Sequence, residues 1–377
     1  MLCTSRPRIL QIISTLEGGG GRNALELVRG FQGDERFEVR LCVLGNPLSD
    51  EAPSLHDPID FLHAPVHQRT TLYRRMTGLR RLISRWQPQL IHSQLWPTAL
   101  TAGLVAPRSL PHLIHIYDTP PSLQSPRWGA SLRRAILRRI VSSPKVRLAA
   151  VSTAAAEYSA EALRVHRSRI RTILNGVSLD RFLAVPELKH HPERPLVIAC
   201  AGRLIPEKGF HQVLEAVRCL TLSHDKFRVC IAGTGTAESS LRELCQQWGI
   251  AEIVQFAGSV SDMPAFFSKA DLFVHGSVAE GLARVLMESF ASGRPVVASE
   301  HAGVREAIHD GVTGLVVPAS DPMALAEAIE SLLTDPNRRL TMGAAARRCA
   351  TNQFSVQRVI REVAELYSDM LIGSSDE

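Results

Sequence analysis

Short apolar runs alternate with amphipathic stretches along the first half of the chain. Each run is bounded by polar residues, Gly or Pro, and helical patterns lie between several of them. The runs are Arg8–Leu16, Val39–Leu44, Leu90–Ser93, Leu113–Tyr117 and Leu148–Ser152. Strands that alternate with helices predict right-handed βαβ units and therefore a parallel sheet.

The second half repeats this scheme more clearly. The pattern predicts strands over 196–201 and 227–232, followed by helices over 209–222 and 238–248 respectively. Further strands are predicted at Ile253–Phe256, Leu272–Val274, Pro295–Ala298 and Leu315–Val317. We therefore expect a second parallel sheet and, after it, a last helix over Thr351–Tyr367.

The chain has 377 residues, which is too long for one ordinary core. The segment from Asn175 to Arg194 contains Asn-Gly, two Pro and two adjacent His, as a linker would. We expect one domain over 1–175 and a second over 176–350, with a helix at about 351–377 packing back on the first. The fold class is then α/β, with two Rossmann-like parallel-sheet domains that face each other across a ligand-binding cleft.

Composition is ordinary for a soluble protein, with 45% hydrophobic and 21% charged residues. No apolar stretch approaches the ~18 residues of a membrane span, and the N-terminal residues do not match a secretory signal. Seven scattered cysteines without a C-x-x-C pair favour reduced, packed thiols. We therefore expect a cytoplasmic protein.

Charge is divided unevenly, because residues 1–175 sum to +12 and the rest to −6. Much of the excess lies in Arg69–Trp86 and Arg127–Val141, which both predict helices with an apolar stripe flanked by Arg. Two compatible interpretations stay open. The stripe packs on the sheet while the Arg side chains are solvated, or the helices also lie peripherally on the anionic inner face of a membrane. No recognised nucleic-acid motif accompanies them, so we expect no nucleic-acid partner.

Two carboxylates, Glu280 and Glu288, are separated by seven residues. If a helix starts near Ala283, Glu280 lies in the preceding loop and Glu288 lies roughly one and a half turns into the helix. The helix N-terminus would then offer backbone N–H groups to a phosphate. Glu288 could accept hydrogen bonds from ribose hydroxyls, and Glu280 from a sugar. Spacing alone equally describes two solvated acids on a surface helix.

A basic turn, Gly202 to Gly209, directly follows a predicted strand. Gly202 allows a ligand to approach the backbone closely. Arg203 and Lys208 place two cations where they could hold a diphosphate, Arg as a fork and Lys as a point charge. An ordinary basic turn is the alternative.

Several short motifs follow one another in a specific order. They are Gly18–Gly21, Val151-Ser152, Asn175-Gly176-Val177, Gly202 to Gly209, Ala232–Gly235, Phe256–Gly258, Glu280–Glu288 and Asp310–Leu315. Together they resemble glycosyltransferase family 4, whose members share the GT-B fold. The resemblance is close over residues 145–345 and loose over the first 145.

The resemblance implies a retaining glycosyltransferase that moves a sugar from a nucleotide-diphosphate sugar to a hydroxyl of a glycan or lipid-linked acceptor. Such enzymes serve cell-envelope polysaccharide, lipopolysaccharide or glycolipid synthesis. Arg203 and Lys208 would bind the donor diphosphate and offset charge on the leaving group, Glu280 would contact the sugar, and Glu288 the ribose. The other implied donor-binding residues are Gly202, Gly281, Ala283, Arg284 and Val285 around the phosphates, and Ser259 and Val260 near the base.

In the first domain, the resemblance points to a Gly-rich loop and a strand end. Gly19, Gly20 and Gly21 precede a helix expected from Asn23 to Phe31, and would accept a phosphate or let the acceptor approach. The family usually has His, often followed by Asp, where this chain has Tyr117 and Asp118. His115 lies one pleat earlier on the same face, either as the sugar-contacting group or as a core residue.

We expect neither a metal nor a cofactor besides the donor. The chain has no D-x-D triplet, its 14 His show no ligand spacing, and the cationic pair can replace a divalent ion. Gly233-Thr234-Gly235 lacks the third Gly of a dinucleotide motif. Two alternatives to a transferase remain. A non-catalytic nucleotide-sugar-binding subunit is favoured only by Tyr117, and a sugar-nucleotide epimerase on the same fold is disfavoured by the Glu280–Glu288 segment.

Overall fold

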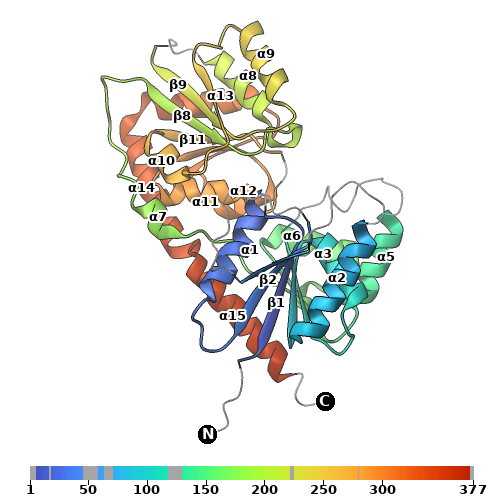
Figure 1. Ribbon diagram of the computed structural model, residues 1–377. Coiled ribbons are helices and arrows are strands. Elements are labelled where there is room, and N and C mark those ends of the chain that lie inside the picture. Colours follow the sequence, from blue (N-terminus) through green and yellow to red (C-terminus); the bar gives the residue numbers. More distant parts are fainter. Residues whose placement is uncertain are drawn as a thin grey trace. The chain divides into compact units, whose positions relative to one another are not determined.

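The computed structural model describes residues 6–16, 18–45, 58–62, 71–117, 130–220, 225–278 and 280–373. The chain divides into two compact units (Figure 1). Unit 1 comprises Met1–Asn175 and Val356–Glu377, and unit 2 comprises Gly176–Ser355. Each unit is an α/β structure built on one parallel sheet.

Unit 1 contains a seven-stranded sheet in the order β3-β2-β1-β4-β5-β6-β7. Its strands are β1 (Arg8–Ile13), β2 (Glu38–Val43), β3 (Ile59–Phe61), β4 (Leu90–Gln94), β5 (His112–Ile116), β6 (Val146–Ala150) and β7 (Ile170–Thr172). Its helices are α1 (Gly18–Gly30), α2 (Thr71–Trp86), α3 (Trp96–Val105), α5 (Ala130–Val141), α6 (Thr153–Leu163) and α15 (Val356–Ile372), with a 3-10 turn η1 (Arg167–Arg169). Strands β1 and β4 are neighbours in the sheet. The chain continues from β1 through β2 to β3 on one side, and from β4 through β5 and β6 to β7 on the other, so the strand order reverses between β1 and β4.

Helix α15 completes the core of unit 1, although it comes from the far end of the chain. Apolar residues of α1 and α15 bury one face of the sheet together, and α2, α3, α5 and α6 bury the other. Tyr367 of α15 is fully buried, and its ring centroid lies 5.6 Å from those of Phe31 and Phe37. In Figure 1, α15 is the red helix beside α1. Unit 1 is therefore discontinuous in sequence.

Unit 2 contains a six-stranded parallel sheet in the order β10-β9-β8-β11-β12-β13. Its strands are β8 (Leu196–Ala201), β9 (Phe227–Ala232), β10 (Val254–Gly258), β11 (Leu272–His275), β12 (Val296–Ser299) and β13 (Gly314–Val317). Its helices are α7 (Leu179–Leu183), α8 (Phe210–Cys219), α9 (Glu238–Gln247), α10 (Met263–Ser268), α11 (Arg284–Ala291), α12 (Ala302–Ala307), α13 (Pro322–Thr334) and α14 (Pro336–Gln353), with a 3-10 turn η2 (Pro206–Lys208). Helices α8, α9 and α13 share the largest apolar core with the sheet.

The fold class expected from the hydrophobic pattern is confirmed, with differences at element ends. Helix α1 begins at Gly18 rather than Asn23, so the Gly-rich segment forms its first turn. The expected last helix is two helices, because α14 runs to Gln353 and α15 begins at Val356. Between them Phe354 is fully buried, and its carbonyl accepts a hydrogen bond from Val177 N at 2.8 Å. That bond takes the carbonyl out of a helical ladder and interrupts the helix.

Candidate functional site

Strand order reverses in unit 2 between β8 and β11, as their outer neighbours are β9 and β12. In open parallel sheets, ligands bind outside the carboxyl ends of the strands at such a switch point. Gly202 and Arg203 directly follow β8, and Glu280 follows β11. The chain's fold therefore brings the basic turn and the first acidic residue, 77 positions apart in the sequence, to one place.

Backbone contacts hold the loops after β8 and β11 against each other. The carbonyl of Glu207 accepts hydrogen bonds from Val278 N and from Ser277 Oγ, both at 3.2 Å. Gly209 has φ +64°, and a Cβ there would lie 1.9 Å from the carbonyl oxygen of Gly276. Only glycine allows this approach, because its φ and its lack of a side chain are both required. The position of Lys208 relative to the second loop is thus fixed by main-chain geometry.

Lys208 and Glu280 form the central charge pair of the site. Lys208 Nζ lies 2.5 Å from Glu280 Oε1, and both side chains are largely buried, at 20% and 16% exposed. Burial by itself would raise the pKa of the Glu280 carboxyl, but the charges of His275 and Lys208 lower that pKa to about 2. Glu280 is consequently an anion at neutral pH, paired with a cation in partly desolvated surroundings.

Two histidines that the sequence pattern did not single out lie beside this pair. His275 ends β11, and its Nε2 lies 3.5 Å from Glu280 Oε1. His301 precedes α12, and its ring centroid lies 5.7 Å from that of His275. Burial lowers the pKa of His275 to about 4, so its imidazole is neutral near pH 7. The only sequence signal for either was a polar residue at the end of an apolar strand, which is common in proteins of many functions.

Helix α11 begins where the spacing of the two glutamates predicted. Ala283 is the N-cap, Glu280 lies in the loop and Glu288 lies within the helix. Arg284 Nε donates a hydrogen bond to Glu288 Oε1 at 2.9 Å, one helical turn away, and both side chains are buried. Glu288 is 3% exposed, so it is not the solvated surface acid that spacing alone also allowed.

The remaining donor-side residues lie at the same carboxyl edge and range from exposed to buried. The Arg203 side chain is exposed and makes no hydrogen bond or ion pair with the described residues. Ser259 and Val260 follow β10, whose last carbonyl, at Gly258, accepts a hydrogen bond from Gly233 N at 2.7 Å. Gly281 and Ala283 are buried, and Val285 is half-buried on α11.

In unit 1, the switch point lies between β1 and β4, and the Gly-rich turn follows β1 there. Gly19, Gly20 and Gly21 belong to the first turn of α1. A Cβ on Gly21 would lie 2.1 Å from the carbonyl oxygen of Leu16, so the turn packs directly on the end of the strand segment. A helix start at a switch point is a suitable place for an anion.

His115 lies fully inside unit 1, in a row of polar side chains on the sheet face that α15 covers. Its ring stacks between those of His92, at 5.5 Å, and Tyr117, at 4.8 Å between centroids. His92 Nδ1 in turn lies 2.7 Å from Tyr367 Oη. Burial lowers the pKa of His115 to about 4. Tyr117 is half-buried at the strand end, and Asp118 lies outside the described residues.

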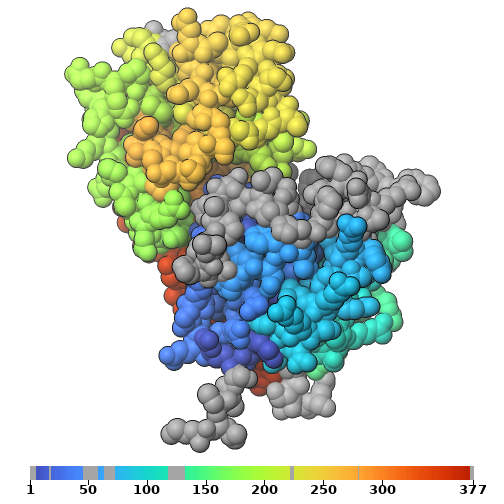
Figure 2. All heavy atoms as spheres, in the orientation of Figure 1, coloured from blue at the N-terminus to red at the C-terminus, as the bar shows by residue number. Residues whose placement is uncertain are grey.

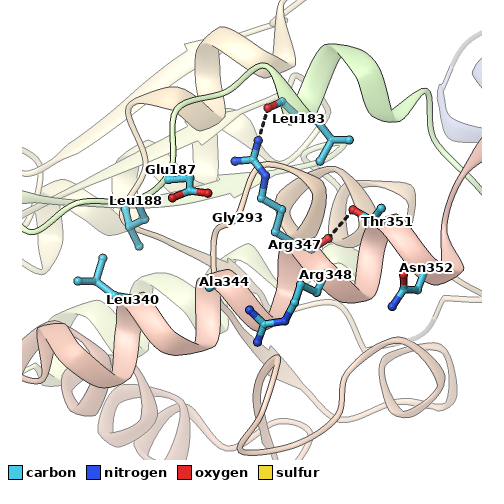
Figure 3. Close-up of a pocket in the computed structure, with 11 residues that line it drawn as sticks. Leu183, Glu187, Leu188, Gly293, Leu340, Ala344, Arg347, Arg348, Thr351 and Asn352 are labelled. Carbon is cyan, nitrogen blue, oxygen red and sulfur yellow. Dashed lines mark hydrogen bonds between the residues drawn. The ribbon is translucent and has the colours of Figure 1, made fainter.

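A separate pocket of about 520 Å³ in unit 2 contains none of the expected donor residues (Figure 3). It lies between α14 and the segment 183–188, where Arg347 donates hydrogen bonds to the carbonyls of Leu183 and, at 3.0 Å, Val185. Leu340 and Ala344 form part of its apolar lining. These contacts hold the segment 183–188, which precedes β8, against α14.

Within the described ranges, no group of three or more His, Cys, Asp or Glu side chains is arranged to hold a metal ion. No helix in the described part of the chain combines the length and the apolar character needed to cross a bilayer.

Comparison with protein families matches both halves of the chain. The model described as Glycosyltransferase Family 4 matches residues 17–181, and the model described as Glycosyl transferases group 1 matches residues 186–349. The two matches meet at the linker segment and together span both sheets.

Curated relatives are similar over about half of their length. The chain is 34% identical over 206 residues to a GDP-mannose-dependent alpha-(1-6)-phosphatidylinositol monomannoside mannosyltransferase of Mycobacterium tuberculosis, covering 50% of this chain and 53% of the relative. It is 31% identical over 194 residues to the lipopolysaccharide core biosynthesis glycosyltransferase LpsE of Rhizobium meliloti, covering 51% and 56%. The chain thus spans about half the length of the curated relatives it matches.

Solved structures match over nearly the whole chain. HepE of Anabaena, solved in complex with UDP and glucose, superposes with a TM-score of 0.80 at 19% identity, covering 96% of this chain and 99% of that one. Sucrose-phosphate synthase from Thermosynechococcus elongatus also gives 0.80 at 19% identity, covering 98% and 100%. These likenesses establish the GT-B fold. With both family matches and the site at the switch point of the second sheet, the chain belongs to glycosyltransferase family 4.

Proposed function

We propose that the protein is a retaining glycosyltransferase that uses a nucleotide-diphosphate sugar. The observation that carries this proposal is the buried pair of Lys208 and Glu280 at the switch point of unit 2, next to the exposed Arg203. The bond between the anomeric carbon and the diphosphate oxygen breaks, and a bond to the acceptor hydroxyl oxygen forms while that hydroxyl passes its proton to the departing diphosphate. Negative charge grows on the diphosphate as its bond to the sugar breaks, and nearby cations stabilise that charge.

Each site residue has a part in this reaction. Arg203 and Lys208 contact the diphosphate and take the place of a divalent ion, so we propose that transfer needs no metal. The N-terminal turn of α11 faces phosphate oxygens with its backbone N–H groups. Glu288 accepts hydrogen bonds from the ribose, and Glu280 from the donor sugar. Ser259 and Val260 lie near the base.

The names of similar proteins suggest the chemical classes of the donor and the acceptor. The names of similar proteins mention GDP-mannose for a mannosyltransferase acting on phosphatidylinositol mannoside, and UDP with glucose for HepE. We propose a nucleotide-diphosphate hexose as the donor and a glycan or lipid-linked hydroxyl as the acceptor. The process is cell-envelope polysaccharide, lipopolysaccharide or glycolipid synthesis, at the cytoplasmic side of the membrane.

A thermal-shift screen tests the donor site. Purified protein is heated with UDP, GDP, ADP, CMP and their common sugar conjugates, with and without EDTA. A ligand present at about 100 times its Kd adds roughly 2.7 kcal/mol of stability. We expect one nucleoside diphosphate and its conjugate to raise Tm equally with and without EDTA, and Arg203→Ala to remove the effect. A folded sample that responds to none of these ligands would contradict the proposal.

We also propose that unit 1 contacts an anionic membrane surface through α2 and α5. Helix α2, light blue in Figures 1 and 2, has no acidic residue and buries Leu79 and Ile83 against the sheet. On its solvent side the exposed cations are Arg74, Arg80, Arg81 and Arg85. Tyr73 of α2 is 72% exposed, and Leu132 of α5 is 66% exposed. Cations beside exposed apolar side chains suit the headgroup region. The stretches that start at Arg69 and Arg127 begin outside the described residues.

Flotation with vesicles tests this contact. Phosphatidylcholine vesicles are compared with vesicles that also contain phosphatidylglycerol. Each basic residue near an anionic surface contributes about 1 kcal/mol, so Arg81→Glu should lower binding to the anionic vesicles by roughly tenfold. Arg348→Glu makes the same charge change at another exposed arginine, in unit 2, and should leave binding unchanged. Equal binding by both variants would refute the contact.

A further inference from the structure

His301 combines deep burial with unused hydrogen-bonding capacity. It lies between β12 and α12 and is 9% exposed. Neither Nδ1 nor Nε2 of its ring has a hydrogen-bond partner among the described residues. A buried polar atom without a partner costs free energy, and most such atoms in native proteins are satisfied. The two nitrogens therefore keep their hydrogen-bonding capacity unused by the described residues.

The surroundings of His301 show which part of the site it belongs to. A Cβ on Gly303, two residues later, would lie 1.5 Å from the carbonyl oxygen of Gly281, so the start of α12 packs on the loop that carries Glu280. The rings of His301 and His275 are 5.7 Å apart, and His275 Nε2 is 3.5 Å from Glu280 Oε1. His301 therefore lies beside the loop of Glu280, on the side away from strand β8 and Arg203, since β12 is the next strand beyond β11.

We propose that His301 is a specificity-determining residue that hydrogen-bonds a hydroxyl group of the donor's sugar. This inference rests on the proposed function, in which Glu280 contacts that sugar. A sugar hydroxyl both donates and accepts a hydrogen bond, and a neutral imidazole offers one donor and one acceptor. The ring is also suited to select among hexoses, because a site that pairs with one hydroxyl rejects a sugar lacking it.

The neutral state of the imidazole agrees with this role. Burial lowers the pKa of His301, and Lys208 lowers it further while Glu280 opposes the shift. A charged imidazolium would offer two donors and no acceptor, and would repel Lys208.

The test measures donor affinity, which does not require the acceptor. Affinities for UDP, GDP, UDP-glucose and GDP-mannose are determined by calorimetry for the wild type and for His301→Phe, which retains an aromatic ring without polar atoms. We expect His301→Phe to weaken binding of the preferred nucleotide sugar about tenfold, as for the loss of one hydrogen bond, and to leave the free diphosphate unaffected. His301→Asn, which keeps a donor and an acceptor, should be intermediate. His309→Phe alters an exposed histidine just after α12 and should match the wild type.

Deoxyfluoro analogues of the preferred nucleotide sugar then locate the hydroxyl. One analogue should bind the wild type about tenfold more weakly than the parent sugar, yet bind His301→Phe as well as the parent does, because the two changes remove the same contact. If every analogue loses affinity equally in both proteins, His301 makes no sugar contact. If the wild type binds no nucleotide or nucleotide sugar of the thermal-shift screen, the proposed function itself fails, which is a different result. A melting curve of His301→Phe near that of the wild type excludes misfolding.

Discussion

At the scale of single residues, Lys208 and Glu280 show how a pair gains strength from its surroundings. Both side chains of the 2.5 Å contact are largely buried, so solvent screens it less than a surface pair. The same low screening would strengthen the attraction between Lys208 and a diphosphate. A donor diphosphate that binds here contacts Lys208 while Glu280 remains paired with it. Glu280 keeps the lysine in place before the donor arrives.

Replacing Lys208 therefore tests the chemistry directly. Lys208→Ala should lower the rate of donor consumption by on the order of 10²–10³, as for the loss of one group that stabilises the leaving charge. Arg242→Ala serves as a control, because Arg242 forms an exposed pair with Glu238 on α9. A loss of less than tenfold in Lys208→Ala would remove this lysine from the proposed mechanism.

A second residue-scale prediction concerns Glu288 and the ribose. Glu288→Gln should weaken nucleoside diphosphate binding about tenfold, because a charged acceptor is replaced by a neutral one. The same substitution should not affect binding of the 2′,3′-dideoxy nucleotide, which has no ribose hydroxyls to offer. Calorimetry with both nucleotides checks this. An equal loss for the two would mean that Glu288 acts through the fold, by its bond to Arg284, rather than on the ribose.

The sequence predicted the charged residues of the site but not the two histidines beside them. Arg203, Lys208, Glu280 and Glu288 stood in motifs with a characteristic order, and the structure places them on the loops and the helix expected. Their roles stay predictions. His275 and His301 had no such signal, because their closeness to Glu280 depends on how α12 packs on the loop at Gly281.

At the scale of elements, close backbone packing sets the geometry that side chains then use. The start of α12 meets the loop at Gly281, and Gly209 meets Gly276 in the same way. Hydrophobic periodicity predicted the longer strands and about half of the helices, namely α1, α2, α5, α8, α9, α11 and α15, because it is local. It did not predict the three-residue strands β3 and β7, the first turn of α1 or the break at Phe354, because neighbouring segments determine these.

An added methyl group at Gly303 should disturb this packing. Gly303→Ala places a Cβ 1.5 Å from the Gly281 carbonyl oxygen, so α12 or the loop must move. Such overpacking costs about 1–3 kcal/mol of unfolding free energy, and donor affinity should fall with it. Gly78→Ala on α2 is the control, since its Cβ would meet only side-chain atoms of Leu62 at 3.4 Å or more. Urea unfolding and calorimetry report both effects, and an unchanged Gly303→Ala protein would be inconsistent with the packing described.

At the scale of the whole molecule, buried neutral histidines link stability to pH. Burial lowers the pKa of His112, His115 and His275 from about 6.5 to about 4. Between these values the unfolded chain binds more protons than the folded one. The free energy of unfolding should therefore fall as pH drops from about 6.5 to 4, by up to about 1.4 kcal/mol per pH unit for each group.

Urea midpoints at pH 7.5, 6 and 5 check this dependence. We expect the midpoint to be highest at pH 7.5 and to fall at each step. The lowered pKa of Glu280 adds a further loss only below about pH 4.5, where that carboxylate begins to be protonated in the unfolded chain. A midpoint that stays constant from pH 7.5 to 5 would contradict the burial of these imidazoles.

The discontinuity of unit 1 has a consequence for the order in which the protein folds during synthesis. Residues up to Asn175 leave the ribosome first, but α15, which covers one face of their sheet, is made only after all of unit 2. Unit 2 is continuous, and its two ends meet where Val177 pairs with Ser355. The part translated second can therefore reach its native state first. The part translated first must keep the portion of its sheet face that α15 covers exposed until Tyr367 is made, and we expect this apolar surface to favour aggregation or chaperone binding in the meantime.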